Sequence, residues 1–178
     1  MKILALSGSL KKSSTNSAII RSIAALAPEN IELCIYERLG ALPHFNPEID
    51  IDPAPAEVAH LRSELKAADA LIICTPEYAF NMPGALKNAL DWTVSSGELV
   101  EKPVAAISAS PSYSGGDKAL KSLLMTLTAL SCRTNSETAF PIPMALKKLN
   151  EKGELLDSET KNKLTRMLGA LEILANNT

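Results

Sequence analysis

The chain has 178 residues, of which 46% are hydrophobic and 21% are charged, a composition typical of one globular domain and not of a disordered chain. Its 18 basic and 20 acidic side chains give a net charge of −2, which disfavours a nucleic-acid partner, and no apolar run approaches the roughly 18 residues of a membrane span. Three cysteines that lie far apart suit neither a disulfide framework nor a zinc site, so we expect one cytoplasmic domain over residues 1–178 with reduced thiols.

Short apolar runs alternate along the chain with segments in which apolar residues recur at helical spacing. We expect strands at residues 3–6, 31–36, 70–74, 104–107 and 133–140. We expect helices around residues 18–26, 58–68, 120–130 and 164–174, and another after Pro83, which suits the start of a helix. This alternation predicts an α/β fold: a flavodoxin-like, doubly wound sheet of five parallel strands in the order 2-1-3-4-5, with helices on both faces.

Ligands bind such a sheet beyond the carboxyl ends of its strands, and the loop after the first strand, residues 7–17, is rich in groups that bind anions. It contains six Ser or Thr hydroxyls and two lysines. It has neither a Walker pattern nor G-x-G-x-x-G, which disfavours a nucleoside triphosphatase and a dinucleotide-binding domain. The groups that can ring a phosphate are Ser9, Ser14, Thr15 and Asn16, with Lys11 as a partial counter-charge. Alternatively, these hydroxyl and amide side chains cap the following helix. If they bind a phosphate, the site suits a mononucleotide cofactor such as FMN.

The loops after the third and fourth strands offer a surface for a planar ligand. In residues 75–84, Pro76 stiffens a turn whose main-chain amides can bond the edge of a ring, beside the aromatic Tyr78 and Phe80. Alternatively, these aromatic side chains pack on the loop after the second strand. In residues 108–117, a glycine pair permits close backbone approach to a ligand, or else forms a flexible turn in which Asp117 caps the next helix.

The chain shows no side-chain set for acid–base or nucleophilic catalysis. His60 lies in a helical segment and His44 in a proline-rich loop, and neither has a suitable partner nearby in sequence. There is no nucleophile elbow and no His, Asp and Glu spacing for a metal ion. We therefore predict no catalytic side chain and no metal, and a cofactor that carries the chemistry itself.

Two motifs resemble those of the NAD(P)H-dependent FMN reductases. Residues 8–16, GSLKKSSTN, resemble the G-S-L-R-x-x-S-x-N phosphate loop of that family, and residues 76–92 resemble its P-E-Y-x-x-x-x-P-G-x-L-K-N-A-x-D-W signature. The similarity extends over nearly the whole chain. It implies a flavodoxin-like fold, non-covalently bound FMN and reduction by NAD(P)H as co-substrate.

The resemblance also implies roles for individual residues. The FMN phosphate is expected at Ser9, Lys11, Ser14, Thr15 and Asn16, the isoalloxazine at the main chain of Pro76, Glu77, Tyr78, Ala79 and Phe80, and the other edge of the site at Ser110 and Ser112. Two departures from the family stand out. Lys11 replaces the usual Arg and loses its planar fork, and Ala79 and Asn81 stand where many members have Asn and Ser.

The resemblance favours an enzyme that passes hydride from NAD(P)H through FMN to a flavin, a quinone or a similar small acceptor by ping-pong turnover. The alternative is a flavodoxin-like FMN electron carrier without substrate turnover of its own, although such carriers are usually more acidic than this chain of net charge −2. A structural protein that keeps the fold without cofactor is a third possibility, which the intact phosphate loop disfavours.

The helix after Pro83 carries two apolar stripes and so predicts a subunit interface. One stripe consists of Leu86, Leu90 and residues 93–94, and the other of Ala85, Ala89 and Trp92. Because one stripe suffices to cover the sheet, we expect the second to pack on another subunit, or else on a loop of the same chain. Together with the resemblance, this predicts a homodimer or homotetramer.

Overall fold

A five-stranded parallel sheet lies at the centre of the protein, in a computed structural model that describes residues 1–11 and 13–177. Its strands are β1 (Lys2–Ser7), β2 (Glu32–Tyr36), β3 (Ala70–Thr75), β4 (Val104–Ala109) and β5 (Ala139–Ile142). The strand order is β2-β1-β3-β4-β5, and all four pairings are parallel, with Leu4 beside Cys34 on one side and beside Leu71 on the other. The flavodoxin-like fold and the strand order predicted from the sequence are confirmed.

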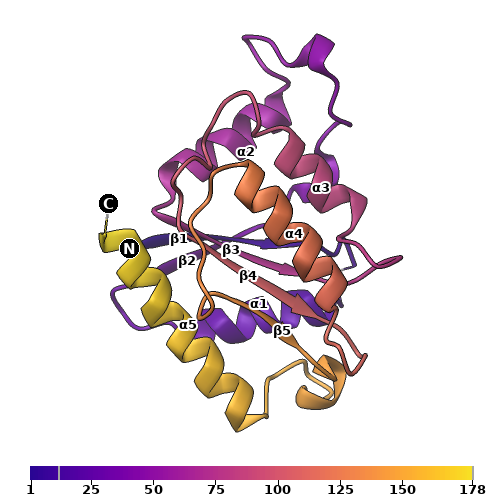
Figure 1. Cartoon of the computed structure of the whole chain (residues 1–178), viewed down its shortest axis with the longest axis vertical. Helices are drawn as coiled ribbons and strands as arrows, with labels where there is room; N and C mark the ends of the chain where they lie inside the picture. Colours follow the sequence, from indigo (N-terminus) through magenta and orange to yellow (C-terminus); the bar gives the residue numbers. More distant parts are fainter. Residues whose placement is uncertain (12, 178) are drawn as a thin grey trace.

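Helices cover both faces of the sheet (Figure 1). They are α1 (Thr15–Leu26), α2 (Ala56–Ala67), α3 (Gly84–Asp91), α4 (Asp117–Ala129) and α5 (Ser158–Asn176). Helices α1 and α5 pack on one face, and α2, α3 and α4 pack on the other. Among the described residues, none of these helices combines the length and apolar character needed to cross a membrane.

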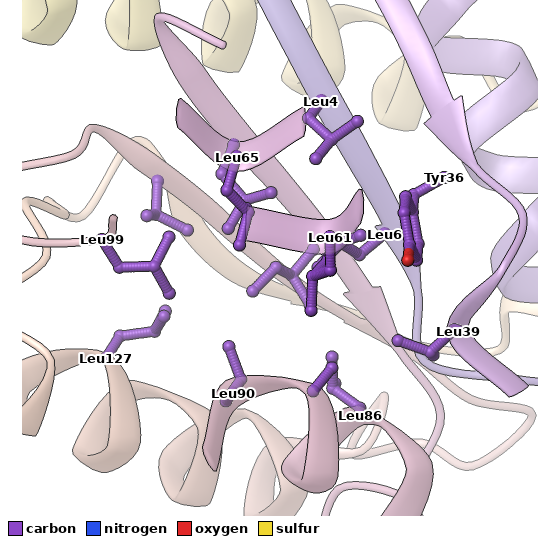
Figure 2. Packing of buried hydrophobic residues seen from close by; sticks show 14 of the residues in the cluster. Leu4, Leu6, Tyr36, Leu39, Leu61, Leu65, Leu86, Leu90, Leu99 and Leu127 are labelled. Atoms are coloured by element: carbon purple, nitrogen blue, oxygen red, sulfur yellow. The ribbon is translucent and has the colours of Figure 1, made fainter. Parts of the chain in front are cut away.

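The two cores follow from the alternation of side chains along each strand. Leu4 and Leu6 point to the face covered by α2, α3 and α4, where they meet leucines of those helices (Figure 2). Leu71 of β3 belongs to the same cluster. Ile3 and Ile72, one position away, point to the face covered by α1 and α5. Every residue of β3 and of β4 is buried. Burial on both faces favours a nearly continuous apolar run, which was read from the sequence for the first and third strands; in β3 and β4 the buried polar residues are Thr75 and Ser108, near the carboxyl ends.

Two elements begin at residues other than those that the apolar pattern alone indicates. The fifth strand begins at Ala139 rather than near residue 133, because the side chain of Asn135 accepts hydrogen bonds from the main-chain N–H of Glu137 and Thr138 at 2.9 and 3.0 Å and closes a turn there. The last helix begins at Ser158, ahead of its apolar stripe, because Asp157 caps it by accepting from Thr160 N–H at 2.9 Å.

The predicted interface at Trp92 is wrong, because a loop of the same chain covers this side chain. Trp92 is fully buried, and its indole Nε1 donates to the Pro43 carbonyl at 2.8 Å. The ring of Phe45 meets it edge-on at 5.0 Å, and Arg62 donates to the Trp92 carbonyl at 2.6 Å. Arg62 also forms an ion pair of 2.7 Å with Asp50. The second stripe of α3 therefore anchors the segment between β2 and α2.

Candidate functional site

A pocket opens at the carboxyl edge of the sheet, bounded by the loops after β1, β3 and β4. Its lining residues are Ser9, Lys11, Ser13, Ser14, Thr15, Asn16, Pro76, Glu77, Tyr78, Ala109, Ser110 and Pro111. The three loops selected from the sequence thus meet at one site, as the topology of a parallel sheet requires.

The loop after β1 reaches the pocket by crossing close over the end of β3. The Gly8 N–H donates to the Cys74 carbonyl at 2.8 Å, and a Cβ on Gly8 would lie 2.8 Å from Thr75 Oγ1 and 3.2 Å from Thr75 Cα. Only glycine allows this approach without moving backbone. The loop then turns into α1, whose first residue, Thr15, follows a few residues later.

The start of α1 supplies donors to the pocket. Ser14 is the N-cap, and its Oγ accepts from Ser17 N–H at 3.1 Å, so the capping role considered from the sequence is confirmed for this residue. Its own hydroxyl proton remains able to donate. Thr15 and Asn16 occupy the first two helical positions, whose main-chain N–H groups have no acceptor within a helix. With the Lys11 ammonium at the rim, this donor set suits a phosphate. The neighbouring Lys12 lies outside the described residues.

Asn16 forms the floor of the pocket and joins three elements. Its side chain is 3% exposed. Its Nδ2 donates to the Ala109 carbonyl at the end of β4 at 3.3 Å, and its Oδ1 accepts from the Cys74 thiol in β3 at 3.2 Å. Burial raises the pKa of the Cys74 thiol above its usual value, which keeps the donor proton in place.

The loop after β3 forms a tight turn at the rim. Tyr78 and Asn81 exchange two main-chain hydrogen bonds of 2.9 and 3.0 Å, around Ala79 and Phe80 with φ of 50° and 62°. Such a left-handed pair is disfavoured for residues other than Gly and Asn. Tyr78 lines the pocket, whereas Phe80 is 69% exposed and lies 3.9 Å below the Lys118 ammonium of α4. The alternative contact of Phe80 with the loop after β2 is therefore not the one observed.

Glu77 uses its carboxylate to cap a helix. Its Oε2 accepts from the main-chain N–H of Lys118 and of Ala119, each at 3.0 Å, at the start of α4. The residue at the N-cap position, Gly116, has φ of 82° and offers no side chain. The alternative in which Asp117 caps this helix is not the arrangement observed: Asp117 is the first helical residue and forms an ion pair with Lys121 at 3.2 Å.

The loop after β4 contributes Ser110 to the pocket. Its Oγ donates to Ser112 Oγ at 3.1 Å, and Ser112 itself stands outside the lining. Gly115, with φ of 66°, lets this loop pass the end of β5, since a Cβ there would come within 2.7 Å of Pro143 N and 2.8 Å of the Ile142 carbonyl carbon.

Most of the residues expected at the site do line the pocket. Those that the structure brings together are Ser9, Lys11, Ser14, Thr15, Asn16, Pro76, Glu77, Tyr78 and Ser110. Ala79, Phe80 and Ser112 flank the pocket without lining it. Sequence reasoning missed Ser13, Ala109 and Pro111, for which the only available signal was their place beside the predicted site residues.

Comparisons with known proteins show similarity to FMN reductases, quinone reductases and related flavoenzymes. The family described as NADPH-dependent FMN reductase matches residues 1–147. An NAD(P)H-dependent FMN reductase of Pseudomonas aeruginosa is 31% identical over 97% of this chain and 94% of its own length, and a quinone reductase of Escherichia coli is 29% identical over 96% and 93%. The solved structure of FerB, a flavoenzyme NAD(P)H:(acceptor) oxidoreductase from Paracoccus denitrificans, superposes with a TM-score of 0.88 at 27% identity, covering 99% of this chain and 97% of that one.

Proposed function

Because this chain belongs to the NADPH-dependent FMN reductases, and so is an oxidoreductase that works with FMN and NAD(P)H, we propose that it passes hydride to a free flavin, a quinone or a similar small acceptor by ping-pong turnover. The observation that carries the proposal is the pocket at the carboxyl edge, where hydroxyl and amide donors and one ammonium converge on one side and a rigid turn lies on the other. Two of the most similar relatives bear the name quinone reductase, which supports a quinone among the acceptors.

The residues of the pocket divide between binding and orientation. Ser9, Ser14, Thr15, Asn16 and Lys11 bind the FMN phosphate, with donors from hydroxyls, amides and the start of α1. The main chain from Pro76 to Phe80, with Ser110 and Ser112 opposite, orients the ring. Bound FMN supplies the hydride chemistry, so the protein needs no catalytic side chain of its own.

Ping-pong turnover follows from one open pocket that serves both substrates in turn. Oxidised NAD(P) leaves before the acceptor enters, and double-reciprocal plots at several fixed acceptor concentrations should be parallel. Intersecting lines would mean that both substrates bind together and would contradict this mechanism. Absence of turnover with quinones and flavins would instead favour an electron carrier.

Flavin titration of the apoprotein tests the phosphate site. Asn16→Ala removes a buried amide donor, and a direct bond to a charged group is worth about 1.5–3 kcal/mol, so the FMN dissociation constant should rise roughly tenfold to a hundredfold. Asn30→Ala is the matched control, because Asn30 is an exposed Asn that bonds Glu172 and lies outside the pocket. An unchanged dissociation constant in Asn16→Ala would contradict the assignment.

We further propose a homodimer or homotetramer that acts in the cytoplasm. Large apolar side chains remain exposed near α3 and α4: Val94 at 64%, Val100 at 57% and Met125 at 75%. All three cysteines are free thiols, which suits a reducing compartment. Light scattering should give a multiple of the 19.0 kDa chain mass, and a monomer mass at micromolar concentration would refute the assembly.

A further inference from the structure

The amide of Asn16 is held from two sides by groups that lie far from it in the sequence. The Ala109 carbonyl is 93 residues away and the Cys74 thiol 58 residues away, and both bonds are buried. Cys74 is fully buried at the carboxyl end of β3. The pocket floor is thus a three-membered chain of hydrogen bonds that links β3, α1 and β4.

The chemistry of the three groups fixes the orientation of the amide. A main-chain carbonyl only accepts, so Ala109 must face the NH₂ group of Asn16. The amide oxygen then faces Cys74, which can satisfy it only by donating its S–H. A thiolate in this position would repel the oxygen; a buried thiol stays protonated and avoids this.

This orientation matters because the two ends of an amide treat an anion differently. Among the described residues, the Asn16 Nδ2 has one acceptor, the Ala109 carbonyl, so its second N–H is free to donate to a group in the pocket that Asn16 lines. A reversed amide would present its oxygen to the same place and repel a phosphate. Holding the oxygen away from the pocket therefore favours anion binding.

We propose that Cys74 is a positioning residue for the phosphate of the cofactor: its buried thiol, by donating to Asn16 Oδ1, keeps an amide N–H directed at the pocket. The proposal rests on the proposed function, in which this pocket binds the FMN phosphate. Cys74 itself does not line the pocket, so its effect on binding passes through Asn16.

Three substitutions separate the donor role of Cys74 from its packing role. Cys74→Ser keeps a hydroxyl donor and should bind FMN with nearly unchanged affinity. Cys74→Val fills the space but cannot donate, and loss of one buried hydrogen bond should weaken FMN binding about fivefold. Cys132→Ala is the matched control, since Cys132 is a free thiol outside the pocket and its replacement should leave FMN binding unchanged.

Titration of each apoprotein with FMN and with riboflavin, which lacks the phosphate, gives a readout that a packing defect would not produce. Cys74→Val should weaken binding of FMN and leave binding of riboflavin unchanged, and it should have no further effect when Asn16 is already Ala. Equal weakening of FMN and riboflavin binding, equal losses of FMN affinity in Cys74→Ser and Cys74→Val, or an additive loss on top of Asn16→Ala would overturn the positioning role.

If Asn16→Ala alone leaves FMN binding unchanged, the phosphate assignment fails and the inference fails with it. If Asn16→Ala weakens binding and Cys74→Val does not, only the inference fails.

Discussion

Replacing Glu77 by Ala should loosen two of the three loops of the pocket at once. The Glu77 carboxylate accepts from two main-chain N–H groups of α4, at 3.0 Å each, while its own backbone lies in the loop after β3. Gly116, at the N-cap position of α4, has no side chain to cap the helix, and among the described residues the side chain that bonds the N–H groups of Lys118 and Ala119 is Glu77. Glu77 therefore caps α4, and the same hydrogen bonds connect the loop after β3 to the end of the loop after β4.

The magnitude follows from the bonds that are lost. Removal of an N-cap side chain costs about 1 kcal/mol, and a carboxylate near the positive end of a helix adds about 0.3–1 kcal/mol. The sum is about 1.3–2 kcal/mol, and because Glu77 is only partly buried, we expect a total near 1.5 kcal/mol for Glu77→Ala. Glu77→Gln keeps an acceptor oxygen without the charge and should lose about half as much. For a chain of this size, 1 kcal/mol corresponds to roughly 2–4 °C, so the Tm of Glu77→Ala should fall by roughly 3–6 °C.

The assay pairs thermal unfolding of the apoprotein with FMN titration. FMN should bind more weakly to Glu77→Ala, because the loops that carry Tyr78 and Ser110 at the rim lose the hydrogen bonds that connect them. Asp117→Ala is the control: it removes a carboxylate from the same helical turn, and with it a similar favourable charge near the helix start and an exposed ion pair with Lys121 worth about 0.2–0.5 kcal/mol, but it leaves both cap bonds intact. If Glu77→Ala unfolds at the same temperature as Asp117→Ala, the cap contributes nothing and the reasoning fails.

Three further predictions concern stability. Ala79→Gly should raise the free energy of unfolding by about 0.5–1 kcal/mol, because it removes the strain of a φ of 50°, and this gain exceeds the loss caused by greater freedom of the unfolded chain. Urea unfolding measures this change, and a lower free energy of unfolding would contradict the strain. Trp92→Phe should cost about 2 kcal/mol through the lost bond to the Pro43 carbonyl and should leave the mass in light scattering unchanged, whereas dissociation would restore Trp92 to an interface. The Lys148 ammonium and Thr160 lower the pKa of Asp157 to about 2, so its stabilising effect is complete above about pH 4 and is lost as the pH falls through about 2. Urea unfolding over that range should show a shallower acid loss in Asp157→Asn, and parallel curves would contradict the shift.

The sequence was sufficient for the sheet because β3 and β4 are apolar except for Thr75 and Ser108 near their carboxyl ends, a pattern imposed by burial on both faces. Topology then brought the three loops to one edge. The hydrogen bonds that hold the loops together could not be predicted. Glu77 and α4 lie 41 residues apart, and Asn16 and Ala109 lie 93 apart, and no local pattern encodes such a bond. Helical spacing likewise marked Trp92 as a contact residue but could not say whether its partner belongs to the same chain.

Side chains at the rim of the pocket can be substituted without breaking the hydrogen bonds that hold the loops, whereas side chains at its floor cannot. Tyr78 at the rim and Phe80 beside it are 56% and 69% exposed, while the bonds that hold the loops in place belong to Asn16 and Glu77, together with main-chain groups. Exchanging an exposed side chain usually alters stability by less than about 0.5 kcal/mol. In the proposed reaction with small acceptors, substitutions at the rim can therefore change the preference for one acceptor over another while the bonds between the loops stay intact. The same division makes these aromatic positions the natural targets for a library selected for turnover of new acceptors.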